Sequence, residues 1–302
     1  MADKERPAQT QEPPGRTGEM APEPRDEMSG YVGRDLLKHR RALITGGDSG
    51  IGRAVAIAFA KEGADLAIAY LEEHDDAKHT AELVRAEGRM CELIPGDLAS
   101  RDHCAEIVER TVAALGGLDI LVNNIATQQA VETPGELTDG QWTHTFDVNI
   151  HSYFRVTAAA LPHLGEGSVI INTGSVNGLR GNKSLIDYSA TKGAIHAWTY
   201  SMAQALVDRG IRINCVAPGP VWTPLIPATL PAEKVEKFGD QVPYDRPAHP
   251  DELAPSYVFF AANQLSSYYT GEVLGPARRR DHARLRTRRG QSSSGHSPVT
   301  FL

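Results

Sequence analysis

The sequence predicts an α/β fold with a single Rossmann-type, doubly wound parallel sheet and helices on both faces. From Ala42 onward, short apolar runs alternate with helical periods, the pattern of repeated β-α units. The first apolar run leads into a glycine-rich turn and then into a helix. A chain of 302 residues with 41% hydrophobic content can bury one substantial core, which leaves length for tails but not for a second full domain.

The first β-α unit carries the glycine-rich turn. A strand at 42–44 is followed by the turn at 45–52 and by a helix that ends near Gly63. Glycines let the backbone approach a pyrophosphate, and the amides and dipole of a helix N-terminus favour its negative charge. The spacing is G-x-x-x-G-x-G, which differs from the general dinucleotide fingerprint. The alternative, a tight turn that merely requires glycine, is disfavoured by the flanking strand and helix.

The next two strands, at 66–70 and 90–94, should approach the adenosine half of a dinucleotide. Glu72 and Glu73 follow the first of them, where an acidic group accepts from a ribose 2'-hydroxyl and repels a 2'-phosphate. This favours NAD, although both glutamates also suit a solvated helix start. Asp97, after the second strand, is placed to reach an adenine amino group.

Two helices and a strand follow. Ser100 is expected to cap a helix that runs to 116–117, and a fourth strand at 118–122 ends in Asn123 and Asn124. These amides lie where open α/β sheets bind ligands. Thr138 and Gln141 predict a capping box for a long helix that contains Asn149. An asparagine in an apolar helix segment needs a partner, and by itself it is more often a satisfied core residue than a catalytic one.

A strand at 168–173 leads to Ser175, and the helix after it places Tyr188 and Lys192 four residues apart on one face. A free tyrosine has a pKa near ~10, so a neighbouring positive charge is needed to favour its phenolate. Lys192 is placed to supply that charge, and the Ser175 hydroxyl is placed to face the phenol. A lone Tyr-x-x-x-Lys is more often an ordinary exposed pair, so the other motifs must decide.

A sixth strand at 211–216 ends in Pro218, Gly219 and Pro220. The segment 221–250 is long and proline-rich with scattered apolar residues, which is typical of an active-site lid. A helix at 252–263 and a short strand at 272–274 complete the predicted sheet. The pocket should be built from 176–187 and 221–250.

The two ends of the chain differ in composition from the predicted domain at 36–276. Residues 1–35 are rich in proline and charge, so we expect an extended or disordered arm that cannot bury enough surface to become ordered. Residues 277–302 carry seven arginines and one aspartate, which leaves the rest of the chain acidic. We expect this tail to be disordered and dispensable for cofactor binding. The abrupt change after Pro276 suggests, as a hypothesis, a reading-frame change.

Composition also excludes several classes of protein. The three cysteines show no metal spacing and suit reduced thiols in a cytosol, so we expect a cytoplasmic protein without a metal site. The sequence has no apolar run long enough for a membrane span and no apolar segment near Met1. The net charge of −7 argues against nucleic-acid binding, although the basic tail keeps an interaction arm possible.

Taken in order, these motifs resemble the short-chain dehydrogenase/reductase family over roughly residues 36–275. The arm, the Gly-Gly-Asp-Ser-Gly-Ile-Gly loop and residues 217–224 further resemble a bacterial subgroup of glucose/ribitol-type dehydrogenases and NADP-dependent aldehyde reductases. The resemblance implies NAD or NADP as cofactor and a carbonyl or alcohol substrate of the aldehyde, sugar or polyol class. It also implies a homo-oligomer, either a tetramer or a dimer, and we expect the unusual tail to weaken that assembly.

The resemblance also assigns roles to matched residues. Tyr188 would donate or accept the proton, Ser175 would hold the substrate oxygen, and Lys192 would bind the nicotinamide ribose and lower the pKa of the phenol. Asn149 would hold a water in a proton relay. The implied cofactor contacts are Gly46, Asp48, Ser49, Gly50, Ile51, Gly52, Tyr70, Asp97, Leu98, Asn124, Tyr188, Lys192, Pro218, Gly219, Val221 and Thr223.

Two departures from the family pattern matter. The usual Asn-Asn-Ala-Gly is replaced by Asn123-Asn124-Ile125-Ala126, which puts a methyl beside the cofactor, and the apolar C-terminus is replaced by the arginine-rich tail. The leading hypothesis is an NAD(P)-dependent oxidoreductase. The alternatives are a non-catalytic NAD(P)-sensing protein on the same fold and, third, a nucleic-acid binder that uses the tail.

Overall fold

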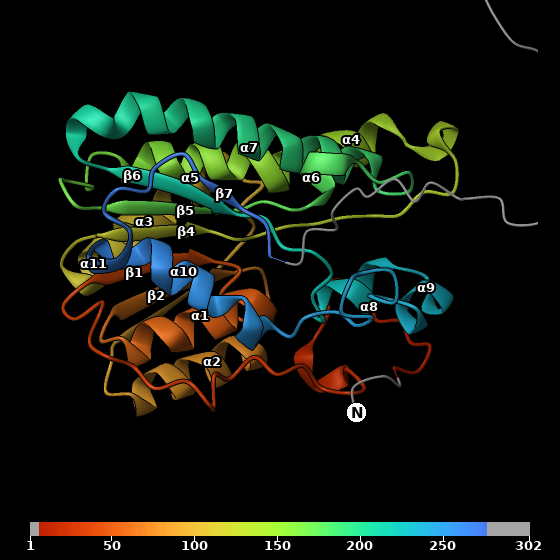
Figure 1. Cartoon of the computed structure of the whole chain (residues 1–302), viewed down its shortest axis with the longest axis horizontal. Helices are drawn as coiled ribbons and strands as arrows, with labels where there is room; N and C mark the ends of the chain where they lie inside the picture. Colours follow the sequence, from red (N-terminus) through yellow and green to blue (C-terminus); the bar gives the residue numbers. More distant parts are fainter. Residues whose placement is uncertain (1–5, 277–302) are drawn as a thin grey trace, which may run out of the picture.

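The core of the molecule is one seven-stranded parallel sheet, as predicted (Figure 1). The computed structural model describes residues 6–276, so the predictions for the tail at 277–302 lie outside the described residues. The strand order is β3-β2-β1-β4-β5-β6-β7. β2 and β3 are added on one side of β1 and the last four strands on its other side, so the sheet is doubly wound. The strands are β1 (Arg41–Thr45), β2 (Asp65–Tyr70), β3 (Cys91–Pro95), β4 (Ile120–Asn123), β5 (Val169–Thr173), β6 (Arg212–Val216) and β7 (Val273–Leu274).

Helices cover both faces of this sheet (Figure 1). Successive residues of a strand point to opposite faces, so Ala42 and Ile44 pack on one side and Leu43 on the other. The first face is covered by α1 (Gly50–Lys61), α2 (His74–Ala86) and α10 (Ala254–Ala261), and the second by α3 (Arg101–Leu115), α5 (Ser152–Ala160) and α7 (Ile186–Leu206). Burial on both faces explains why the strands are almost uniformly apolar.

The remaining described elements are short. They are η1 (Thr17–Glu19), η2 (Pro134–Glu136), α4 (Asp139–Phe146), η3 (Asp147–His151), α6 (Asn177–Arg180), η4 (Val207–Arg209), α8 (Leu225–Thr229), α9 (Ala232–Glu236), η5 (Pro250–Glu252) and α11 (Asn263–Ser266). The predicted helix at 252–263 is therefore divided, because Ala262 is extended (ψ 109°) and ends α10.

Two predicted helix caps had different outcomes. Thr138 caps α4 as expected, since its hydroxyl accepts from the Gln141 amide at 3.1 Å, but the Gln141 side chain donates to Gln129 and Asp187 and does not close a capping box. Ser100 occupies the predicted N-cap position of α3, but its side chain makes no cap hydrogen bond. The turn before α3 is held instead by the Asp97 carboxylate, which accepts from the Ala99 amide at 2.8 Å.

The expectation that the proline-rich arm buries little surface is also wrong. Most of it has no regular secondary structure, yet Met20 and Met28 are buried, at 4% and 3% exposure. Met20 packs with Trp222, Ile226 and Val235 of the predicted lid. Proline removes the backbone freedom that ordering would otherwise cost, and a few apolar anchors then suffice to fix the segment.

Two further findings concern the described residues as a whole. None of their helices is long and apolar enough to cross a bilayer, and they contain no group of three or more His, Cys, Asp and Glu side chains arranged to hold a metal. Cys91, Cys104 and Cys215 are all buried free thiols, as the sequence suggested.

Candidate active site

A cavity of about 1080 Å³ lies at the carboxyl ends of the strands, where an open α/β sheet binds its ligands. Most of the predicted site residues line it: Gly46, Asp48, Ser49, Gly50, Ile51, Tyr70, Asp97, Asn124, Ser175, Tyr188, Lys192, Pro218, Gly219, Val221 and Thr223. Three predicted residues, Asn149, Gly52 and Leu98, are not part of the lining.

The glycine-rich turn forms one end of the cavity, and its shape depends on glycine. Gly46 and Gly50 have positive φ angles of 63° and 52°, a region that other residues rarely adopt. Gly52 does not line the cavity because it packs against the turn: a Cβ there would lie 1.8 Å from the Gly46 carbonyl oxygen. Its role is to bring α1 close to the turn.

A dinucleotide fits this end of the cavity. The amides of Ser49 and Ile51 have no acceptor among the described residues, and both residues line the cavity at the N-terminus of α1. Such amides are ready donors for phosphate oxygens. The residues present therefore suit the pyrophosphate of a nicotinamide cofactor.

The adenosine side is acidic. Asp48 is buried, and burial followed by the charge of Glu73 raises the pKa of its carboxyl to about 7. Glu73 lines this cavity and also a second cavity under the arm, whereas Glu72 lines only the second. The Leu98 side chain is 1% exposed and packs in the core with residues of α3, so a cofactor contact there would have to be made by its backbone.

Asn124 links the turn to β5. Its side-chain amide donates to the Gly46 carbonyl at 2.9 Å, and its side-chain oxygen accepts from the Thr173 hydroxyl at 3.2 Å. Ile125 and Ala126, which replace the usual Ala-Gly of the family, both line the cavity. Ile125 also packs against two core clusters, so part of its side chain is taken up by the core.

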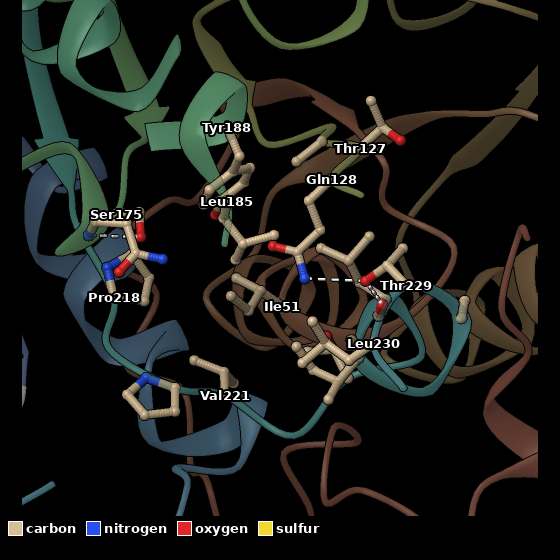
Figure 2. A pocket seen from close by; sticks show the side chains of 18 of the residues that line it. Ile51, Thr127, Gln128, Ser175, Leu185, Tyr188, Pro218, Val221, Thr229 and Leu230 are labelled. Carbon is tan, nitrogen blue, oxygen red and sulfur yellow. Dashed lines mark hydrogen bonds between the residues drawn. The ribbon is translucent and has the colours of Figure 1, made fainter. Parts of the chain in front are cut away.

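Tyr188, Ser175 and Lys192 meet at the other end of the cavity. Figure 2 shows Ser175 and Tyr188 facing the same space, and the Ser175 hydroxyl acts on the phenol as a neighbour that lowers its pKa. The Lys192 ammonium donates to the Thr173 carbonyl at 2.7 Å and lies 5.6 Å from the centre of the Tyr188 ring. Residues from β5 and α7 thus converge because α7 packs across the end of that strand.

The protonation of this group differs from what the sequence suggested. Burial raises the pKa of Tyr188 to about 12, although the Ser175 hydroxyl opposes the rise. Burial also lowers the pKa of Lys192 to about 8. Desolvation of the phenolate thus dominates the pKa of Tyr188 in the protein groups alone, and the lowering of that pKa by Lys192 stays a prediction.

Asn149 is completely buried within the π-helical segment η3 between α4 and α5. Its side-chain oxygen accepts from the Thr127 amide at 2.7 Å, and its amide group donates to the Thr127 carbonyl and the Thr191 hydroxyl. The side chain therefore has the partners that its burial requires. It holds Thr127, which lines the cavity, rather than lining the cavity itself.

Sequence reasoning missed two groups near the catalytic residues. His196, on α7, accepts from the Ser175 amide at 3.5 Å, and burial lowers the pKa of its imidazole to about 4. A neutral ring can accept this bond. Gln128 is buried across the cavity from Ser175 and donates to the Thr229 hydroxyl at 2.9 Å (Figure 2). The spacing of His196 from Lys192, four residues on the same helix, was the available signal.

The substrate end of the cavity comes from the two segments that the sequence indicated, 176–187 and 221–250, together with residues 125–128. Its lining mixes apolar side chains such as Val176, Leu185 and Ile226 with amides, hydroxyls and lysines such as Asn182, Ser184 and Lys183. Such a lining can bind a small, oxygen-rich molecule.

Comparison with known proteins agrees with this geometry. Residues 46–275 match a family model described as enoyl-(acyl carrier protein) reductase. General stress protein 39 of Bacillus subtilis is 54% identical over 90% of this chain and 95% of its own length. NADPH-dependent aldehyde reductase 1, chloroplastic, of Arabidopsis thaliana is 47% identical over 87% and 93%, and glucose and ribitol dehydrogenase of Daucus carota is 44% identical over 89% and 95%.

Two solved structures show the same fold. A short-chain dehydrogenase from Burkholderia cenocepacia J2315 in complex with NADP has a TM-score of 0.75 and 32% identity, covering 80% of this chain and 98% of that one. An NADH-dependent reductase, A1-R', responsible for alginate metabolism has a TM-score of 0.72 and 29% identity, covering 80% and 97%. The chain belongs to the short-chain dehydrogenase/reductase family, and the predicted subgroup is confirmed. It is an NAD(P)-dependent oxidoreductase of that family.

Proposed function

We propose that the protein reduces small, polar aldehydes and related carbonyl compounds, including open-chain sugars, to alcohols with NADH or NADPH. The observation that carries the proposal is the group formed by Tyr188, Ser175 and Lys192 at the end of a cavity whose other end suits a dinucleotide. The names of the aldehyde-reducing and polyol-oxidising relatives support the substrate class.

In this mechanism the Ser175 hydroxyl holds the carbonyl oxygen of the substrate, and Tyr188 donates its proton to that oxygen as negative charge develops there. When bound, a nicotinamide cofactor would supply the hydride that the carbonyl carbon accepts. Because burial raises the pKa of Tyr188 to about 12, the phenol is protonated at neutral pH and suits reduction better than oxidation. Lys192 binds the nicotinamide ribose, and Asn149 maintains the shape of the site through Thr127.

Both cofactors remain candidates for this chain. Asp48 and Glu73 at the adenosine end favour a ribose without a 2'-phosphate, which supports NAD. NADPH appears in the name of one relative and NADH in that of another. Titration of the purified protein with NADH and with NADPH compares the two directly, and we expect acidic residues at that end to weaken NADPH binding.

A homo-oligomer is also proposed. The outer surfaces of α5 and of the segment before β7 expose large apolar side chains, with Phe154 at 60% and Tyr268 at 99% exposure. Burial of these two side chains against another subunit would remove their apolar surface from water. Light scattering should give a dimer or a tetramer, and a monomer at micromolar concentration would contradict this part of the proposal.

The activity is tested by following the absorbance of NADH and NADPH with a panel of aldehydes, sugars and polyols. We expect turnover on at least one small aldehyde, abolished in Tyr188→Phe. Tight cofactor binding with no turnover on any compound would support the alternative of an NAD(P)-sensing protein.

A further inference from the structure

The N-terminal arm places a buried carboxylate against the cofactor loop. Asp26 is 2% exposed, and its Oδ2 accepts from the amide of Gly50, the first residue of α1, at 3.2 Å. The residue that would normally cap this helix, Ser49, makes no side-chain cap bond. The cap is therefore supplied by the arm, from 24 residues earlier in the chain.

Arg53 completes this arrangement. Its guanidinium lies 3.4 Å from the Asp26 carboxylate, and both side chains are 2% exposed. Its Nε and Nη2 atoms donate to the Asp48 carbonyl at 3.1 and 2.9 Å, and Nη2 also pairs with Asp76 at 2.6 Å. Asp26 and Arg53 thus hold the glycine-rich turn at two points, the Gly50 amide and the Asp48 carbonyl.

We propose that Asp26 is a positioning residue for the dinucleotide, which fixes the turn at 46–52 so that the amides of Ser49 and Ile51 face the cavity. The proposal rests on the proposed function, because it requires that this cavity binds a nicotinamide dinucleotide. In this proposal the arm contributes to cofactor binding by fixing the glycine-rich turn. None of the sequence motifs suggested this role.

A carboxylate near a helix N-terminus also repels a phosphate that binds there. The positioning effect of Asp26 on the turn must therefore be distinguished from this repulsion. Asp26 lines a second cavity, of about 1000 Å³, on the arm side of the turn, whereas Gly50 and Ile51 line the cofactor cavity. Its charge is directly opposed by Arg53. The carboxylate therefore binds the Gly50 amide from the arm side of the turn, and the paired guanidinium offsets its repulsion of phosphate.

The cost of burying Asp26 agrees with a functional role. Burial raises the pKa of its carboxyl to about 6, and Glu27 and Asp251 add to the rise, although Arg53 and the Gly50 amide oppose it. A buried ion pair of this kind is a weak source of stability. Its clearest effect in the structure is on the shape of the turn, which it holds at the Gly50 amide.

The test measures dissociation constants for NADH and NADPH by fluorescence titration with wild type, Asp26→Asn, Asp26→Ala and the control Glu27→Gln. Glu27 is the adjacent arm acid but is exposed and pairs with His79, so it controls for the change in charge. We expect Asp26→Ala to weaken both cofactors about five- to tenfold, corresponding to a lost cap. Asp26→Asn should lose less, because its amide oxygen still accepts from Gly50, and Glu27→Gln should lose nothing.

The same variants are compared in kcat at saturating cofactor, where we expect values within about twofold of wild type. Unchanged or tighter cofactor binding in Asp26→Ala would overturn the proposal, as would an equal loss in Glu27→Gln. If Asp26→Ala does not fold, Asp26→Asn decides by the same criterion. A wild-type protein that binds neither cofactor would instead refute the proposed function and this inference together.

Discussion

The catalytic end of the cavity and the N-terminal arm both contribute to one site, but different kinds of contact hold them in place. Ser175, Tyr188 and Lys192 come from one strand end and the helix after it, within 18 residues of the chain. The arm is held by contacts between distant residues: Arg6 donates to the Phe238 carbonyl at 3.0 Å, and Trp222 donates to the Pro22 carbonyl at 2.8 Å. The first region follows from local geometry, whereas the second depends on tertiary packing.

This difference suggests that the two regions have different roles. The catalytic end carries the groups that we propose act on the substrate, and the arm contacts the glycine-rich turn and the lid. Variants of Tyr188 should therefore change the rate of the chemical step, variants in the arm should change binding, and variants of Lys192, which we propose also binds the ribose, should change both. The predictions below separate these effects, beginning with the largest.

Tyr188→Phe is expected to reduce kcat for carbonyl reduction about 10³-fold, because it removes the proton donor. Cofactor binding should change by less than about threefold, since the ring and the helix remain. Steady-state kinetics and cofactor titration measure both. Tyr200→Phe, an exposed tyrosine on the same helix, is the matched control and should behave as wild type. Retention of most activity in Tyr188→Phe would remove the phenol from the mechanism.

Lys192→Met should reduce kcat and weaken cofactor binding together, each by about tenfold or more, since one ammonium serves both the ribose and the catalytic group. Methionine preserves most of the buried volume, so the loss reports the charge and its hydrogen bond to Thr173. The two constants are measured as for Tyr188→Phe. Unchanged cofactor affinity would refute the ribose role.

The same variant allows a test of the lowered lysine pKa. The pKa of Lys192 is about 8 in the folded protein and is ordinarily 10.5, so between these values the unfolded chain binds more protons. The stability of wild type relative to Lys192→Met should therefore rise as pH increases from 8 to 10.5, by up to about 3 kcal/mol. Urea unfolding of both proteins at several pH values measures this difference. A constant difference would contradict the shift.

Met20→Ala should act on the lid. Met20 packs with Trp222, Ile226 and Val235, and truncation leaves a cavity in that cluster. We expect KM for the carbonyl substrate to rise about three- to tenfold, with kcat within about twofold of wild type. Met90→Ala is the control, because Met90 is 53% exposed. An effect on kcat that equals the effect on KM would show that the arm does more than support the lid.

Much of the fold could be predicted because parallel strands buried on both faces leave a continuous apolar signal, as in 42–44 and 168–173. The catalytic group could be predicted because strand ends and helix spacing fix where Ser175, Tyr188 and Lys192 lie. The direction of the Leu98 side chain could not be predicted in this way: the resemblance implied a cofactor contact at this position, and the structure shows that the side chain packs in the core.

The arm could not be predicted because its composition resembles that of a disordered segment. Only the folded body reveals that Met20 has an apolar cluster to join and that Asp26 has Arg53 and the Gly50 amide as partners. The pKa of Tyr188 could not be predicted either, because desolvation depends on every group around the phenol.

The separation of chemistry from positioning is tested most directly by measuring kcat and the cofactor dissociation constant for Tyr188→Phe and Asp26→Ala side by side on one aldehyde. The account predicts that Tyr188→Phe loses kcat while keeping cofactor affinity, and that Asp26→Ala loses cofactor affinity while keeping kcat at saturation. Loss of the same constant in both variants would contradict it.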